Sequence, residues 1–425
     1  MLFGRFHVEH RMLQALRKKI DDQNVLRIYW ATFGLGVAYG MAISVIAVFL
    51  AGRGYRETDI GSLAAWFAAG IMAAAVPSGI LVARLSAKVV LTLALVTYAL
   101  TVTLFPFAPS YAAIAVLRFF DGVASVCVWV ASETILLARA RREIKAFVTS
   151  LYAMSIAIGY ITGPLLAYLA APIIPIEGTF WIAGGLAVVT AMYVALRLER
   201  GSDAHREPGH DANVDVVSDA AAAVERAPLG TLINRIKASC FATFAYGYFQ
   251  ASVVLFLPLF LVAQKGVSED ATRLIPAFFA GGMLLFTNYA GRLGDRHGHL
   301  LIMRLLAIVG ASMIAGFVWL GSFTEMCGAV FVAGATLASI SPLSLALQGL
   351  VTREYSRATG VYNAFYAAGM LLGPPISSQI YHRLGGGPML YHLAALWVAF
   401  IVFAQVFRRD DPAVAREPQA SIAVS

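Results

Sequence analysis

The stretch GRLGDRHGHL, residues 291–300, is the most informative segment of the sequence for the fold. It places two arginines, one aspartate, two histidines and three glycines between two long apolar runs. A related turn stands 212 residues earlier, where GILVARLSAK, residues 79–88, also separates two apolar runs and keeps Gly79, Leu81 and Arg84. We interpret the earlier turn as a diverged copy of the later one, so the sequence predicts an internal repeat.

The composition indicates a membrane protein. Of the 425 residues, 59% are hydrophobic and only 13% are charged, whereas soluble domains carry about a quarter charged residues. An apolar run of about 18 residues or more can cross a hydrocarbon core that is ~30 Å thick. Twelve such runs are present, at 28–51, 60–83, 88–107, 111–138, 146–171, 178–198, 238–263, 274–292, 300–320, 326–350, 358–382 and 389–407.

The positive charges follow the predicted membrane. With a cytoplasmic N-terminus, the inner segments hold 26 of the 32 Lys and Arg residues and the outer loops hold 5, while Arg118 lies inside a span. This asymmetry is the positive-inside rule, and it predicts a cell-membrane protein with both termini in the cytoplasm. Topology therefore explains the net charge of +8, and no nucleic-acid partner is expected.

The repeat extends beyond the polar turns. Ala31-Thr32-Phe33 returns as Ala242-Thr243-Phe244, and Gly163-Pro164 returns as Gly373-Pro374, at offsets of 211 and 210 residues. We therefore predict an all-α membrane protein with twelve transmembrane helices in two pseudo-symmetric six-helix bundles. The expected parts are a cytoplasmic arm at 1–27, a bundle at 28–198, a cytoplasmic linker at 199–237, a bundle at 238–407 and a cytoplasmic tail at 408–425.

This organisation resembles the major facilitator superfamily over almost the whole chain. In that family the turn after the second helix of a half reads G-x-L-x-D-R-x-G-[RK]. The later copy in this chain supplies Gly291, Leu293, Asp295, Arg296 and Gly298, with His299 in the last position. The earlier copy keeps Arg84 and Lys88 but has Ala83 in place of the acid and Ser86 in place of the second glycine.

The resemblance implies that this turn is a gate. Asp295 at a helix terminus can face the positive end of a neighbouring helix and an arginine, and so link the two bundles in one of two global states. It would then act as a latch that stabilises the outward-facing form, with Arg296 and Arg84 in the same gate. A topological anchor without a gating role is the alternative.

The predicted span 111–138 carries three ionisable residues, Arg118, Asp121 and Glu133. Charges within a bilayer are costly and usually face a cavity or a partner. Arg118 and Asp121 are three residues apart on one helical face, so we expect them to pair. Arg118 and Gly122 also resemble the R-x-x-x-G motif of proton-coupled members, which implies proton coupling at Asp121. A fixed ion pair that only orients the helix is the alternative.

Glu133 lies close to the cytoplasmic end of the same span. We expect it within reach of Arg84 or Lys88, as a gate residue that replaces the acid missing at Ala83. An ordinary interfacial carboxylate is the alternative. In the next span, Gly159, Gly163 and Pro164 resemble the G-x-x-x-G-P element of twelve-helix proton-coupled exporters, although the repeated Gly373-Pro374 leaves simple helix packing open.

The resemblance also implies a central cavity lined by the first, fourth, seventh and tenth helices, with contributions from the fifth and eleventh. Hydroxyls, amides and aromatic rings with little fixed charge suit a neutral, amphipathic or cationic organic molecule better than a polyanion. Packing is the alternative role for these side chains. The predicted lining residues are Tyr39, Thr243, Tyr246, Gln250, Tyr362, Asn363 and Tyr366.

We therefore expect a secondary active transporter, a proton-coupled exporter of a small organic molecule that acts as a monomer by alternating access. Its partners would be the substrate, protons and the lipid bilayer. A proton symporter for uptake, or a non-transporting receptor on the same fold, is the alternative. An enzyme is not expected, because the sequence has no P-loop and no catalytic cluster, and neither a cofactor nor a metal is predicted.

Overall fold

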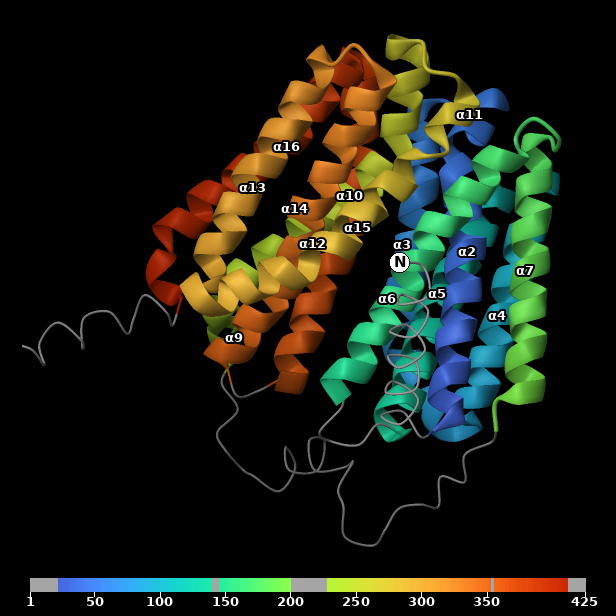
Figure 1. The fold of residues 1–425 in the computed structure, drawn as a ribbon, viewed down its shortest axis with the longest axis horizontal. Coiled ribbons are helices and arrows are strands. Elements are labelled where there is room, and N and C mark those ends of the chain that lie inside the picture. The colour runs from blue at the N-terminus through green and yellow to red at the C-terminus, as the bar shows by residue number, and fades with distance from the viewer. Residues whose placement is uncertain (1–21, 140–144, 200–227, 353–354, 412–425) are drawn as a thin grey trace, which may run out of the picture.

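A computed structural model describes residues 22–139, 145–199, 228–352 and 355–411. The predicted arm at 1–27, the linker at 199–237 and the tail at 408–425 lie mostly outside these described residues, so only their edges are seen. The described elements are helices, as expected from the composition (Figure 1).

Twelve helices of at least 18 residues form the body of the described chain, one at each predicted span. The first six are α2 (Gln23–Gly52), α3 (Glu57–Leu85), α4 (Ala87–Leu104), α5 (Tyr111–Arg139), α6 (Lys145–Ala170) and α7 (Ile176–Arg197). The second six are α10 (Lys237–Lys265), α12 (Ile275–His297), α13 (His299–Gly316), α14 (Phe323–Val351), α15 (Tyr355–Leu384) and α16 (Gly386–Val406).

Short elements join or end some of the long helices. They are η1 (Phe105–Phe107), α9 (Leu229–Arg235), α11 (Glu269–Thr272), η3 (Phe317–Trp319) and η4 (Arg408–Asp410). Eleven of the long helices are apolar enough to cross a membrane by length and composition among the described residues. The twelfth, α15, is more polar in composition, and its residues Tyr362, Ser377 and Ser378 are buried inside the protein.

Each half repeats the same pairs of closely crossing helices. In the first half α2 crosses α6 and α3 crosses α5, and in the second half α10 crosses α15 and α12 crosses α14. Each crossing has a glycine on both helices, where an added Cβ would lie within about 3 Å of the facing backbone. The glycine pairs are Gly36 with Gly159, Gly70 with Gly122, Gly247 with Gly369, and Gly282 with Gly334.

These glycines stand at the repeat offsets of 210 to 212 residues, so the internal repeat predicted from sequence is confirmed as a repeat of helix packing. The two polar turns also match in backbone shape. Gly298 ends α12 with φ +96° and ψ 133°, and Ser86 ends α3 with φ +78° and ψ 147°. Ser86 is the only non-glycine residue with positive φ in the described chain. This backbone region belongs almost entirely to glycine and costs other residues about 1–3 kcal/mol.

The two six-helix groups meet at one end and separate at the other. Contacts between them come mainly from α3 with α15, α6 with α12 and α2 with α10. At the end where α6 and α15 finish, Gly61 of α3 packs against the backbone of Pro374 in α15. Towards the opposite end, where α6 begins and α9 lies, the ribbons of the two groups move apart (Figure 1).

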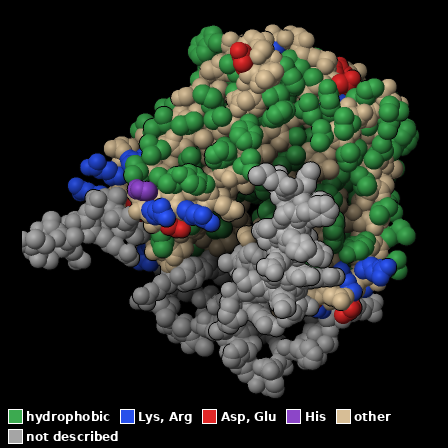
Figure 2. All heavy atoms as spheres, in the orientation of Figure 1, with side chains coloured by type: hydrophobic (Ala, Val, Ile, Leu, Met, Phe, Trp, Pro, Cys, Tyr) green, Lys and Arg blue, Asp and Glu red, His purple; other side chains and the backbone are tan. Residues whose placement is uncertain are grey.

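The outer surface suits a lipid environment. Large apolar side chains such as Val76, Leu196 and Leu285 are exposed on the flanks. Figure 2 shows such side chains covering the flanks, whereas Lys and Arg side chains gather near the lower edge. An apolar surface this extensive would be a liability in water, and a bilayer covers it.

Candidate functional site

A cavity of about 410 Å³ lies between the two six-helix groups. The helices expected from the family resemblance all contribute side chains to it, and these are α2, α5, α6, α10, α14 and α15. The second helix of each half, α3 and α12, also lines the cavity, through residues such as Phe67 and Phe279. The cavity therefore draws on both halves.

Four of the seven predicted lining residues face this cavity, Tyr39, Tyr246, Gln250 and Tyr366. Tyr246 and Tyr366 stack with ring centroids 6.2 Å apart. The Tyr366 hydroxyl donates a hydrogen bond of 3.0 Å to Oε1 of Gln250. These contacts join α10 to α15 and present an aromatic and amide surface.

The structure places the other three predicted lining residues away from the cavity wall. Thr243 is fully buried in α10. Tyr362 is buried between α15 and α14, where its hydroxyl donates a 2.9 Å hydrogen bond to the Ser341 carbonyl. Asn363, one residue further along α15, is exposed outside the cavity wall. Helical spacing placed Thr243 near Tyr246, and placed Tyr362 and Asn363 near Tyr366. Offsets of three and four residues still turn a side chain by about 60° and 40° around the helix, which is enough to take these residues off the cavity wall.

Sequence reasoning missed a row of cavity residues on α6. Tyr152, Ile156 and Tyr160 line the cavity, and their spacing of four puts them on one helical face. Tyr160 lies beside Tyr39 with ring centroids 5.4 Å apart. The spacing of four was the available signal, because it repeats aromatic residues along one stripe of a predicted span.

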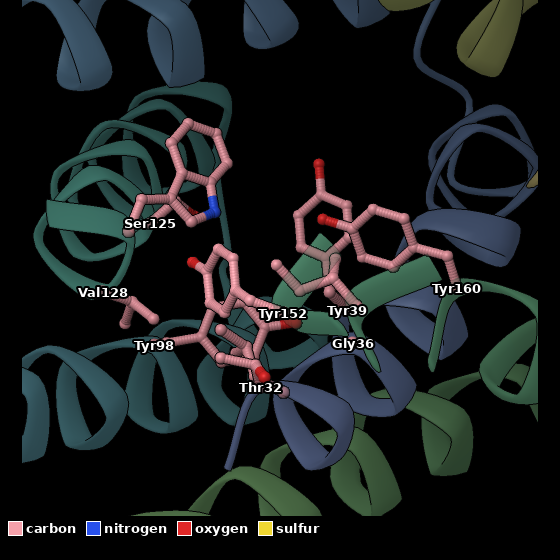
Figure 3. A pocket seen from close by; sticks show the side chains of 11 residues that line it. Thr32, Gly36, Tyr39, Tyr98, Ser125, Val128, Tyr152 and Tyr160 are labelled. Carbon is pink, nitrogen blue, oxygen red and sulfur yellow. The ribbon is translucent and has the colours of Figure 1, made fainter. Parts of the chain in front are cut away.

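A recess behind Tyr39 extends the cavity into the first half. It encloses about 20 Å³, space for a water-sized molecule, and Figure 3 shows Tyr39, Tyr98, Tyr152 and Tyr160 around it. A second small pocket shares Tyr39 and Tyr98 with the recess and is lined by Arg118 and Asp121. Tyr39 and Tyr98 thus lie between the recess and the ionisable residues of α5.

The predicted pairing of Arg118 and Asp121 is confirmed. Both side chains are buried, and Nη1 of Arg118 donates to Oδ2 of Asp121. The guanidinium carbon of Arg118 lies 4.4 Å from the centroid of the Phe67 ring, a cation–π contact. Phe67 reaches this position because α3 crosses α5 closely at Gly122, where an added Cβ would lie 2.0 Å from the Phe67 carbonyl oxygen.

Two polar atoms next to this pair lack hydrogen-bond partners in the described part of the chain. They are the second carboxylate oxygen of Asp121, Oδ1, and the hydroxyl of Tyr98. Buried polar atoms are rarely left without partners. The Asp121 carboxylate thus has one oxygen bound to Arg118 and one oxygen available for a proton or a water molecule.

Glu133 is placed differently from the expectation. It lines the central cavity and is exposed to it. Arg84 is an exposed residue of the last turn of α3, and neither it nor Lys88 pairs with Glu133 within the described residues. The carboxylate instead lies on the face of α5 that also carries Trp129, one turn earlier.

Asp295 and Arg296 of the later polar turn lie on the surface in this conformation, whereas Gly298 and His299 are buried. The Asp295 side chain is 73% exposed, and its Oδ1 lies 3.3 Å from Nε2 of His299, within the same half. Arg296 is exposed, Gly291 is partly buried, and Gly298 makes the break between α12 and α13. No ion pair to the first half is seen for Asp295 among the described residues.

The closed end is held by residues that sequence reasoning did not select. Nη1 of Arg273 donates a 2.9 Å hydrogen bond to the carbonyl of Ala167, and Nη2 lies 2.8 Å from Asp270. Ala167 is in the last turn of α6, where helix carbonyls lack intrahelical partners. The Arg273 side chain is only 6% exposed and joins the second half to the first.

A second, weaker polar contact also joins the two halves. Nδ1 of His382, near the end of α15, is 3.4 Å from a carboxylate oxygen of Glu57 in the first turn of α3. In the described residues no group of three metal-binding side chains is found. The polar contacts between the halves thus lie at the end of the cavity away from α9.

Comparison with known proteins identifies the family. The family model described as Major Facilitator Superfamily matches the chain twice, over residues 28–238 and 239–423. A relative from Yersinia pestis (strain Pestoides F), named "Uncharacterized MFS-type transporter", is 25% identical over 300 residues, which cover 69% of this chain and 72% of the relative.

Solved structures share the fold at low sequence identity. The nucleoside transporter NupG superposes with a TM-score of 0.71 at 14% identity, covering 91% of this chain and 97% of that chain. A D-xylose-proton symporter gives a TM-score of 0.69 at 15% identity, covering 89% of this chain and 96% of that chain. Both matches cover the two halves together with the cavity between them.

Proposed function

The chain belongs to the Major Facilitator Superfamily, a family of multi-pass membrane transporters and not of enzymes, and from that premise we propose a proton-coupled exporter of a small organic molecule. The protein would work as a monomer in the cell membrane, with both termini in the cytoplasm. The observation that carries this proposal is the cavity between the halves, which borders the buried pair of Arg118 and Asp121.

Alternating access requires that the cavity open at each end in turn. In the conformation described, the halves are joined at the end that carries Arg273 and separate at the end that carries α9. Because α9 follows the central linker, which we place in the cytoplasm, this conformation is inward-facing in our proposal. Release of the Arg273 contact and closure at the polar turns would produce the outward-facing form.

Asp121 is the proposed proton carrier. When the carboxylate takes up a proton, it loses its charge and Arg118 loses its ion-pair partner. The guanidinium would then be held by the Phe67 ring alone on the cavity wall, where a bound substrate can respond to the change. Protonation and substrate binding are thus coupled through one arginine side chain.

Uptake by proton symport is the second candidate function. The D-xylose-proton symporter that shares this fold is a precedent for that direction. The fold is compatible with either direction, since the same two conformations serve both.

We predict that a single cysteine in the cavity is labelled from each membrane face in turn. The three native cysteines, Cys127, Cys240 and Cys327, are buried and can be replaced first. A cysteine at Val254, which lines the cavity, then reports access to a membrane-impermeant maleimide in vesicles of known orientation. Labelling from one face only, under every condition of substrate and pH gradient, would indicate a receptor and contradict the transporter proposal.

In the same assay, Arg273→Ala and Asp295→Asn should shift labelling in opposite directions. Arg273 stabilises the end that is closed here, so its loss should increase labelling from the outer face. Asp295 is the proposed latch of the other state, so its replacement should decrease that labelling. Arg409→Ala, which removes an exposed cation from η4, is the matched control and should behave as the parent.

The opposite signs make this prediction specific. Any substitution that merely loosens the protein would raise labelling from both faces. If Asp295→Asn leaves labelling and transport unaltered, the polar turn is a topological anchor and the latch assignment is wrong.

A further inference from the structure

The wall of the central cavity carries one unpaired charge. Among the described residues that line the cavity, only Arg118 and Glu133 bear side chains that are ordinarily charged at neutral pH. Arg118 is already paired with Asp121. Glu133 is exposed to the cavity and has no ion-pair partner in the described chain. The described part of the wall, with the Arg118–Asp121 pair counted as neutral, therefore presents a single net negative charge, located at Glu133.

Aromatic side chains cover the wall around this charge. Trp129 lies one turn before Glu133 on α5, and Tyr152 and Tyr160 face the same space from α6. On the other half, the stacked rings of Tyr246 and Tyr366 face the cavity. The faces of aromatic rings attract cations, because the ring quadrupole places negative charge above and below the ring plane.

We propose that Glu133 is the counter-ion of the substrate, and that the substrate is an organic monocation with a flat aromatic ring system. The carboxylate supplies the one opposite charge, and Trp129 and the tyrosines supply surfaces on which a flat ring stacks. A polyanion would meet the unpaired carboxylate and an apolar wall, and a neutral ligand would leave that carboxylate without a partner. Transport of this cation rests on the proposed function, whereas its binding does not.

The cavity also has the size that such a ligand needs. Sites for drug-sized molecules usually enclose about 300–1,000 Å³, and this cavity encloses about 410 Å³. The assignment changes the role expected of Glu133 from sequence. Its carboxylate lies on the cavity wall beside Trp129 rather than beside Arg84 or Lys88, so it is placed to contact a ligand and not to close a gate.

The test compares two probes that share one ring system and differ in charge. N-methylphenanthridinium is a flat aromatic cation, and phenanthridine is its neutral counterpart at pH 7.5. Equilibrium binding of each to the purified full chain is measured by isothermal titration calorimetry, which does not depend on Trp129 as a reporter. We expect the parent to bind the cation at least about tenfold more tightly than the neutral probe.

Glu133→Gln keeps the size and removes the charge. It should weaken binding of the cation by about tenfold and leave binding of the neutral probe unchanged, which also shows that the variant is folded. Glu177→Gln makes the same chemical change in the first turn of α7, away from the cavity, and should alter neither affinity. Trp129→Ala should weaken both probes, since it removes a stacking surface.

The outcomes separate this inference from the transporter proposal. If the two probes bind the parent equally, or if Glu133→Gln leaves the cation affinity unchanged, the counter-ion assignment is wrong even when labelling alternates between the faces. If Glu133→Gln selectively weakens the cation while labelling stays on one face, the cation site stands and the transporter proposal fails.

Discussion

Asp121→Asn is expected to abolish accumulation of substrate against its gradient in proteoliposomes with an imposed pH gradient. The amide keeps the shape of the carboxylate and its hydrogen bond from Arg118, but it cannot take up and release a proton. Binding and downhill exchange should survive in part, because the cavity wall is unchanged. The readout is the ratio of internal to external substrate, which should fall to its equilibrium value while exchange continues.

Arg118→Ala should be more damaging than Asp121→Asn. It leaves the buried Asp121 carboxylate without its partner and removes the cation–π contact with Phe67. Loss of one partner of a buried pair costs about 3–5 kcal/mol. We therefore expect less folded protein as well as no accumulation, measured by monodisperse yield and by transport.

Asp59→Asn is the matched control for the carboxylate. It makes the same chemical change in the first turn of α3, where the Asp59 carboxylate lies 3.8 Å from Arg56 at the surface. It should accumulate substrate as the parent does. If Asp121→Asn also concentrates substrate with the parent's pH dependence, the pair is structural and coupling resides elsewhere.

Gly122→Val is expected to prevent folding of the first half. An added Cβ at this position lies 2.0 Å from the Phe67 carbonyl oxygen and 3.0 Å from the Ile71 backbone nitrogen. Both neighbours are backbone atoms of α3, so relief requires that the two helices separate. Overpacking of a tight site usually costs 1–3 kcal/mol, and we expect a cost above about 3 kcal/mol here because the clash is with backbone.

The measurement is the fraction of monodisperse protein after extraction and after heating. Gly185→Val is the control, because a Cβ at Gly185 in α7 meets open space. The equivalent crossing in the second half offers an independent test, since a Cβ at Gly334 would lie 2.1 Å from the Phe279 carbonyl oxygen. Parent-like yields for Gly122→Val and for Gly334→Val would show that close packing at these glycines does not hold the crossing helices together.

The fold was predictable because its signals are local. Each transmembrane span is recognisable from the length and apolarity of its segment, and the repeat is visible in motifs such as Gly163-Pro164 and Gly373-Pro374. The pairing of Arg118 with Asp121 was also predictable, since three residues along a helix bring side chains together whatever surrounds them. Local geometry was enough in these cases.

The junction at Arg273 was not predictable from the same signals. Arg273 is a cation in the short segment between α10 and α12, as ordinary in sequence as Arg53 or Lys265. Its role depends on an unpaired carbonyl of Ala167, which becomes its neighbour only when the two halves meet. The position of Glu133 has the same cause, because the rotation of α5 against α3 and α6 decides whether that residue faces the cavity or the polar turn.

Ser86 bears on how the two halves should be compared. Ser86 and Gly298 are different residue types at equivalent positions of the repeat, yet their backbone dihedral angles are similar. The backbone conformation of this turn is therefore present in both halves, although only the second half has the glycine that favours it. A comparison of backbone dihedral angles would align the halves at this position, where a substitution matrix would score them as unrelated. Internal repeats whose sequences have diverged further than these can be detected by the same comparison of backbone dihedral angles.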